Sequence, residues 1–283
     1  MSDPYARKVY LQPLPGSPPA RFSKGAQRRT AQLRRFLGEL QAGAAPHLGD
    51  LSSTELLIVS RQDWKALFSY PYGLPFIRTH KAAQDGPRIS IVAAADYPPR
   101  MLRRWDDILV RAAQAGEHAP GDVREFLDLL IGHEWGHAAA NRAGLRSRVK
   151  WLDEFMATYL FLAALEAADL DAVKARFTAW ARLQVAGTTI KRADLGSFEY
   201  PRGRLDFNAL LWFQGVFTLR AVELLEVRGW DFPAVLLERL SAEKKLHRGE
   251  VTRILLEVEP SFREWFKVFA HAETDSEEVL RQK

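Results

Sequence analysis

The sequence predicts an α+β fold, in which a small β-sheet is followed by a mainly helical C-terminal part. Two short runs of β-branched and aliphatic residues, at 55–60 and 88–94, have the length and composition of strands. After residue 96 the apolar residues recur at three- and four-residue steps towards the C-terminus, which is the pattern of helices. A chain of 283 residues is long enough to bury a full core. We therefore expect one large domain at 51–283, with a sheet-containing part at 51–121 and a helical part at 122–283.

In front of this domain, residues 1–50 are expected to form an N-terminal arm and a basic amphipathic helix. The prolines and small residues of 1–22 are typical of an extended or disordered segment with no core. The segment 24–40 has the apolar spacing of a helix, and the stretch AGAAPHLGD after it has the composition of a linker. This helix carries four arginines, which are Arg28, Arg29, Arg34 and Arg35. We interpret them as a solvated face, so nucleic acid is not an expected partner despite the net charge of +5.

The sheet-containing part is expected to hold the two strands and a short helix between them. In the second strand, Ile89, Ile91 and Ala93 alternate with Ser90, Val92 and Ala94. This is the pattern of a strand with one face packed against helices. Between the strands we expect a helix at 63–68 and a loop with the sequence SYPYGLPF at 69–76.

A helix of the second part is predicted to begin at Asp122. Pro120 and Gly121 precede it, and Asp122 with Glu125 fits a D-x-x-E capping box, in which each side chain satisfies a backbone N–H of the first turn. Several residues then recur at helical spacing, namely Phe126, Leu129, Leu130, His133, His137 and Ala140. The two histidines therefore lie on the buried face of this helix, one turn apart.

His133 and His137 belong to the motif HEWGH. Two imidazoles at i and i+4 can bind one zinc ion at about 2.0–2.1 Å, and since the chain has no cysteine, any further protein ligand must be an imidazole or a carboxylate. Zinc lowers the pKa of a bound water towards about 7, and Glu134 could take its proton as the water attacks a carbonyl carbon. The alternative is a pair of core histidines bonded to backbone carbonyls.

A catalytic zinc usually needs a third protein ligand. The longer motif HExxHxxGxxH is absent, because Ala140 and Ala143 occupy its glycine and third histidine positions. The next helix, predicted from about Lys150, places Glu154 on an apolar face, where a carboxylate is costly unless it meets a cation. Two alternatives remain open, which are a helix-start glutamate stabilised by the helix dipole and Asp153 as the ligand.

These residues resemble the gluzincin metallopeptidases, whose helix after HExxH supplies a glutamate ligand within a W-x-x-E-x-x-A pattern. Trp151, Glu154 and Ala157 stand in those places. The order of elements over roughly 51–273 is also similar to that of the bacterial peptidase MA-like domains. The resemblance implies a zincin-like fold, Zn²⁺ with Glu154 as its third ligand, and a peptide or protein substrate. It further implies that the strand 88–94 borders the cleft and could pair with an extended peptide.

Two positions depart from the family pattern. Many gluzincins have an aspartate four residues after the glutamate ligand that orients a histidine, whereas this chain has Thr158, whose hydroxyl accepts a bond more weakly. Relatives often carry a tyrosine for the oxyanion in the helix at 207–229, where this chain reads Leu211, Trp212, Phe213 and Gln214. Four other residues are candidates for that role, although such residues are more often structural, and they are Tyr200, Tyr159, Tyr97 and His80.

The residues therefore predict a hydrolase, namely a zinc metallopeptidase with Glu134 as general base. One alternative is a zincin-fold module that binds a partner and retains zinc without hydrolysis. Another is a regulatory protease of the ImmA/IrrE type, although the chain has no recognisable DNA-binding module. The N-terminus lacks the apolar stretch of a signal peptide, and the longest apolar run, 155–165, is too short for a bilayer. We expect a cytoplasmic protein with no membrane partner.

Overall fold

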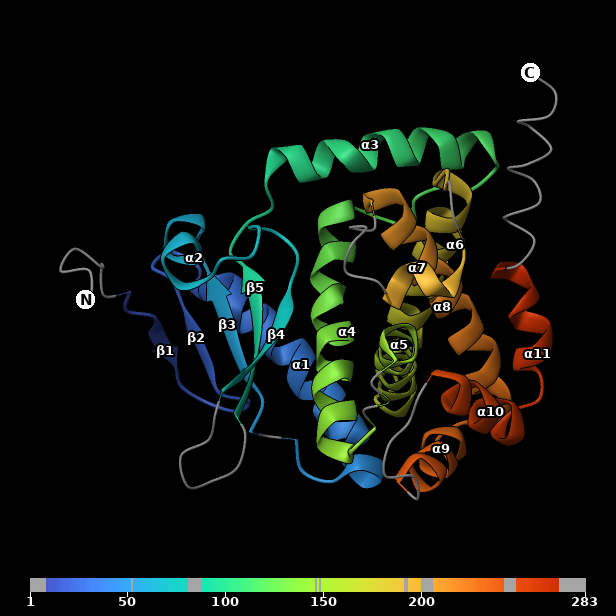
Figure 1. Cartoon of the computed structure of the whole chain (residues 1–283). Coiled ribbons are helices and arrows are strands. Elements are labelled where there is room, and N and C mark those ends of the chain that lie inside the picture. Colours follow the sequence, from blue (N-terminus) through green and yellow to red (C-terminus); the bar gives the residue numbers. More distant parts are fainter. Residues whose placement is uncertain are drawn as a thin grey trace, which may run out of the picture.

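The computed structural model describes residues 9–51, 53–80, 88–145, 147, 149–190, 193–199, 206–241 and 248–269. A mixed five-stranded sheet lies at one side of the molecule and a group of helices lies at the other (Figure 1). This arrangement confirms the predicted α+β class. Among the described residues, no helix has both the length and the apolarity that crossing a bilayer requires.

The sheet has the strand order β1-β2-β3-β5-β4. Its strands are β1 (Gln12–Leu14), β2 (Ala20–Phe22), β3 (Glu55–Val59), β4 (Phe76–His80) and β5 (Arg88–Ala94). The central pairs β2–β3 and β3–β5 are parallel, and the outer pairs β1–β2 and β5–β4 are antiparallel. The two strands predicted from sequence, β3 and β5, are confirmed, and they lie side by side in the sheet.

The N-terminal segment departs from its prediction, because residues 12–22 form strands and contribute to the core. Ala20 and Phe22 of β2 are buried, and β2 pairs with β3, so the sheet continues across the boundary expected at residue 50. The helix α1 (Gln27–Leu48) extends beyond the predicted 24–40 into the expected linker. Ala44 in this extension is fully buried, so tertiary packing outweighs the weak helix propensity of the glycine and proline there.

Two arginines of α1 have structural partners. The guanidinium of Arg29 forms an ion pair with Asp128, with 2.5 Å between Nη2 and Oδ1, and donates to the carbonyl oxygen of Ala94. Arg34 donates to the carbonyl oxygen of Leu14 at 3.2 Å. These two cations therefore connect the helix to the rest of the protein, whereas the prediction placed them on a solvated face.

The sheet is buried on both faces. On one face, Leu56, Ile58 and Ile91 belong to the main core together with the apolar side of α1. On the other face, Leu57 and Val92 pack in a smaller cluster around Trp64 of α2 (Arg61–Leu67). The alternation predicted for β5 is thus confirmed, and both of its faces are covered.

The strand β4 is the outermost strand beside β5 and was not predicted from the sequence. It pairs antiparallel with β5, which therefore has neighbours on both edges. The expectation that 88–94 borders a cleft as a free edge is wrong, and β4 occupies that edge. Its five residues include three polar ones, Arg78, Thr79 and His80, so they lack the apolar run by which the other strands were recognised.

The helices after residue 98 surround α5 (Lys150–Ala167), which is seen end-on in Figure 1. Contacts join α5 to α1, α4, α6 and α8, and side chains on every side of it are buried. The remaining helices are α3 (Pro99–Gln114), α4 (Val123–Ala143), α6 (Asp171–Gly187), α7 (Leu195–Glu199), α8 (Phe207–Arg228), α9 (Asp231–Ser241), α10 (Arg248–Val258) and α11 (Phe262–Trp265).

Two glycines let α4 and α5 approach each other closely. A Cβ atom at Gly132 would lie 2.1 Å from the ring of Phe161, and a Cβ atom at Gly136 would lie 2.0 Å from the carbonyl oxygen of Ala157. Side-chain carbons essentially never come closer than 3.0 Å to such atoms. The motif HEWGH is therefore held against α5 by a contact that only glycine permits.

Candidate metal centre

The helix α4 carries the motif and begins where the sequence predicts. Asp122 is its N-cap, and the carboxylate of Asp122 accepts from the backbone N–H of Arg124 at 2.7 Å. The reciprocal half of the predicted capping box is wrong, because the carboxylate of Glu125 accepts from Arg176 of α6 at 3.0 Å instead. An ion pair with a neighbouring helix thus replaces the local hydrogen bond.

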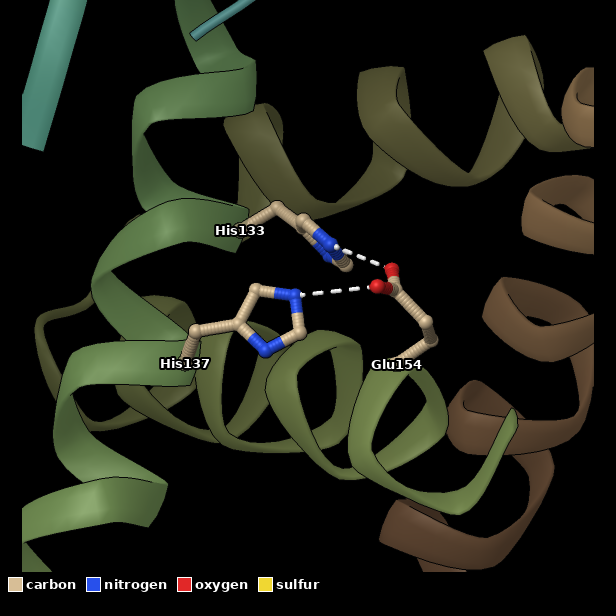
Figure 2. A group of neighbouring side chains, drawn as sticks. All are labelled: His133, His137 and Glu154. Carbon is tan, nitrogen blue, oxygen red and sulfur yellow. Dashed lines mark hydrogen bonds and ion pairs between the residues drawn. The ribbon is translucent and has the colours of Figure 1, made fainter. Parts of the chain in front are cut away.

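His133 and His137 of α4 point towards Glu154 of α5 (Figure 2). The Nε2 atom of His133 lies 3.1 Å from Oε2 of Glu154, and the Nε2 atom of His137 lies 3.4 Å from Oε1. The two imidazole rings are 4.7 Å apart between centroids and nearly perpendicular. The structure therefore brings together the three residues that were predicted as metal ligands.

The donor set fits a divalent metal ion. Ligand atoms from His133, His137 and Glu154 all lie within 4.8 Å of one another. Four ligands arranged tetrahedrally at about 2.0–2.1 Å from zinc are about 3.3 Å from each other. The nitrogen–oxygen distances of 3.1 and 3.4 Å are close to that value. Two imidazoles and a carboxylate are also a ligand combination that catalytic zinc sites use.

Thr158 orients His133 from one turn further along α5. The Nδ1 atom of His133 lies 3.1 Å from Oγ1 of Thr158, and the Thr158 hydroxyl donates to the backbone carbonyl of Glu154 at 3.1 Å. Because the hydroxyl proton is used in that bond, the threonine oxygen accepts from Nδ1–H of the histidine. In the neutral imidazole the lone pair of His133 is then on Nε2, where it can bind a metal ion, and Nε2 donates to Glu154 only when the ring is protonated.

Gln214 of α8 contacts the same carboxylate. Its Nε2 donates to Oε2 of Glu154 at 2.7 Å. No role was predicted for this glutamine from the sequence. The sequence does mark Gln214 as unusual, because it is a lone amide within the apolar stretch 209–217. It does not show which carboxylate the amide contacts. The amide holds Glu154 in place from the side opposite the motif helix.

The charges of the three residues are coupled. Burial lowers the pKa of His133, and its bond to Glu154 only partly opposes this. At His137 burial acts in the same direction, but the hydrogen bond and the negative charge of Glu154 outweigh it and raise the pKa to about 9. Burial would raise the pKa of Glu154, yet its bonds to both imidazoles hold that pKa well below its usual range. The carboxylate of Glu154 is therefore ionised, and its negative charge can balance the positive charge of a neighbouring cation.

Glu134 adjoins this group and lines a cavity together with His133 and Glu154. Burial raises the pKa of Glu134 to about 8, and the charge of Glu154 contributes in the same direction. A neighbouring positive charge on His137 and the backbone N–H of Ile77 in β4 oppose the rise. A carboxyl group with a pKa close to neutrality can both accept and release a proton at physiological pH.

Two cavities border the candidate metal centre. Cavity A, of about 240 Å³, lies between α3, α4, α6 and α8 and includes Leu74 and Pro75 in its wall. Cavity B, of about 280 Å³, is bordered by Ile77 and Thr79 of β4 and by residues of α4 and α5. Glu154 lines both cavities. Each of the three clustered residues thus borders at least one cavity, and cavity B also borders the outer strand β4.

The alternative ligand Asp153 has other partners. Its carboxylate accepts from the backbone N–H and the hydroxyl of Ser147, at 3.0 and 2.8 Å. Asp153 therefore fixes the start of α5, and the neighbouring Glu154 is the residue that faces the histidines.

The other candidates for the oxyanion have separate contacts. The hydroxyl of Tyr159 is directed at the carbonyl oxygen of Gly229, at 2.6 Å, and that of Tyr97 donates to Asp128 at 2.7 Å. His80 contacts the hydroxyl of Ser90, with 3.0 Å between Nε2 and Oγ. The structure does not bring these three side chains to the metal centre. Tyr200 lies outside the described residues.

Comparison of the chain with protein-family models, with curated proteins and with solved structures gives no match.

Proposed function

We propose that this protein is a zinc-dependent metallopeptidase with a zincin-like fold, of the gluzincin type and similar to the peptidase MA-like domains. The observation that carries the proposal is the convergence of His133, His137 and Glu154, with Glu134 in the wall of the same cavity. A purely structural metal site has no need of a carboxylate base beside it, and such sites are closed by a fourth protein ligand. Among the described residues, only three side chains form the group.

The chain's own residues would perform the proton transfers. A bound zinc ion would polarise the carbonyl group of the substrate and acidify a water molecule. Glu134, which lines the same cavity as His133 and Glu154, would take the proton of the attacking water and deliver it to the leaving amine. Thr158 and Gln214 would keep His133 and Glu154 in their positions during the reaction.

Gln214 is also suited to stabilise negative charge on the substrate oxygen. Its amide nitrogen donates to Oε2 of Glu154 at 2.7 Å, and the residue lines cavity A, so its second N–H would donate to the carbonyl oxygen of a substrate bound beside Glu154. Amide donors of this kind stabilise oxyanions in other hydrolases. This glutamine would take the part that a tyrosine of α8 plays in related families.

Metal analysis of the purified protein tests the first half of the proposal. The wild type should bind about one zinc ion per chain, and His133→Ala and Glu154→Ala should each lose it. Retention of full zinc occupancy by both variants would show that the metal is held elsewhere.

Cleavage of a broad peptide library, followed by mass spectrometry, tests the second half. The wild type should cleave peptides, whereas Glu134→Gln should keep its zinc and lose at least about 100-fold in rate. A zinc-loaded wild type that cleaves no peptide in the library would instead favour the alternative, a zincin-fold module that binds a partner. The absence of a tyrosine hydroxyl at the centre, among the described candidates, is the observation that favours this second function.

A further inference from the structure

Cavity A, the space beside the candidate metal centre, has a wall that is mostly aromatic and aliphatic. His133, Glu134 and Glu154 form part of this wall, so a group that fills the cavity lies beside the candidate metal centre. Apolar side chains form the greater part of the wall, and they include Trp105, Phe126, Leu130, Phe177, Phe207 and Leu211. Such a wall favours a large apolar group.

Gln184 of α6 is one of the polar residues in this wall. It is only 4% exposed, yet among the described residues its side-chain amide has no hydrogen-bond partner. Both polar atoms of the amide are accessible to solvent. Since Gln184 lines cavity A, the space that these atoms reach is that cavity. Because both atoms are open to the cavity, a ligand with a matching polar group can bond to this amide in place of water.

The other polar side chains of the cavity have bonds of their own. The amide nitrogen of Gln214 donates to Glu154, and the hydroxyl of Thr218 donates to the backbone carbonyl of Gln214 at 2.7 Å. Gln184 therefore differs from these two residues, because a ligand can engage either end of its amide without breaking a bond between described residues.

We infer that cavity A is a specificity pocket for a tyrosine side chain next to the peptide bond that the protein cleaves. The aromatic wall accommodates the ring, and the phenol hydroxyl both donates and accepts, as the carbonyl and the NH₂ group of Gln184 require. The part of this inference that concerns cleavage rests on the proposed function, whereas the complementarity of the pocket does not.

Other side chains match the pocket less well. The side chain of a substrate phenylalanine or leucine would contact the apolar wall but would leave the amide of Gln184 without a partner. An acidic side chain would bring a further carboxylate into a cavity that Glu134 and Glu154 already line.

Binding of p-cresol and toluene to the metal-free protein tests the pocket without any catalytic step. Titration calorimetry should show that the wild type binds p-cresol at least about 10-fold more tightly than toluene. Gln184→Leu should reverse this preference, because the leucine side chain leaves no partner for the hydroxyl. Gln114→Leu, at an exposed glutamine of α3, serves as the matched control and should behave as the wild type. Equal affinity for the two ligands in the wild type would overturn the inference.

Cleavage of a peptide series then tests the substrate. In peptides that differ at one position, the zinc-loaded wild type should prefer tyrosine to phenylalanine by about 10-fold or more in kcat/KM, and Gln184→Leu should remove the preference. Cleavage without that preference would overturn the tyrosine assignment while the proposed peptidase function stands. A p-cresol preference that Gln184→Leu reverses, in a protein that cleaves no peptide, would support the pocket and refute the peptidase.

Discussion

Gly136 lies between the two histidines of α4, and replacing it with alanine is expected to disrupt both the packing of α4 on α5 and the metal centre. The new Cβ atom would lie 2.0 Å from the carbonyl oxygen of Ala157 and 2.7 Å from its carbonyl carbon. Since contacts under 3.0 Å essentially do not occur, the two helices must separate by about 1 Å at this point. Backbone atoms cannot rotate away as the end of a flexible side chain can.

The magnitude follows from two opposing terms. Alanine is the better helix former, by up to about 1 kcal/mol, but overpacking in a tight core costs about 1–3 kcal/mol or more. Because the overlap here is with backbone, we expect the free energy of unfolding to fall by about 2 kcal/mol. The nitrogen and oxygen ligand atoms come from the two helices that separate, and metal sites tolerate errors of only about 0.2 Å, so zinc affinity should fall at least about 10-fold.

Urea unfolding of the metal-free protein, followed by circular dichroism, measures the first effect, and competition with a chromophoric chelator measures the second. Gly249→Ala is the matched control, because no atom lies within 4 Å of the added methyl group at this helical glycine of α10. Its unfolding free energy should change by less than about 1 kcal/mol, with zinc affinity unaltered. If Gly136→Ala were as stable as the wild type and bound zinc equally well, the close approach of α4 and α5 would not be what positions the ligands.

Three further predictions concern single hydrogen bonds. Gln214→Leu removes the amide that donates to the carboxylate ligand, and zinc affinity should fall about 10–100-fold in the chelator competition; an unchanged affinity would mean that the bond does not position the ligand. Thr158→Val leaves Nδ1 of His133 without its acceptor and should weaken zinc binding by about 10-fold, whereas Thr158→Ser, which keeps the hydroxyl, should restore it. Burial raises the pKa of Tyr159, whose hydroxyl contacts the carbonyl of Gly229, so its protonated form stabilises the fold. That stabilisation is complete below the unfolded pKa of about 10 and is lost as the pH rises above it. Tyr159→Phe should therefore show a shallower loss of stability between pH 10 and 12 than the wild type, as measured by urea unfolding; equal slopes would show that this phenol does not titrate with unfolding.

Local patterns in the sequence were sufficient for several features. The capping residue Asp122 marks the start of α4, and the four-residue spacing of His133 and His137 places both imidazoles on one side of it. The alternation in β5 likewise identified a strand with a core-facing side. These predictions succeed because helix and strand geometry fix which residues of one element share a face, whatever the rest of the chain does.

Other features depend on contacts between distant elements. The choice between the adjacent carboxylates Asp153 and Glu154 was settled by Ser147, which binds the first, and by the histidines, which face the second. The approach of Gln214, sixty residues away from Glu154, depends on how α8 packs against α5.

The strands β1, β2 and β4 are short or partly polar, so their composition alone does not predict a strand. Pairing with neighbouring strands stabilises them in the extended conformation. The sequence by itself therefore determined the motif, the face that presents its histidines and the class of fold. Only the tertiary structure decided which carboxylate and which amide complete the centre, and which strand lies beside it, because those are set by the packing of elements far apart in the chain.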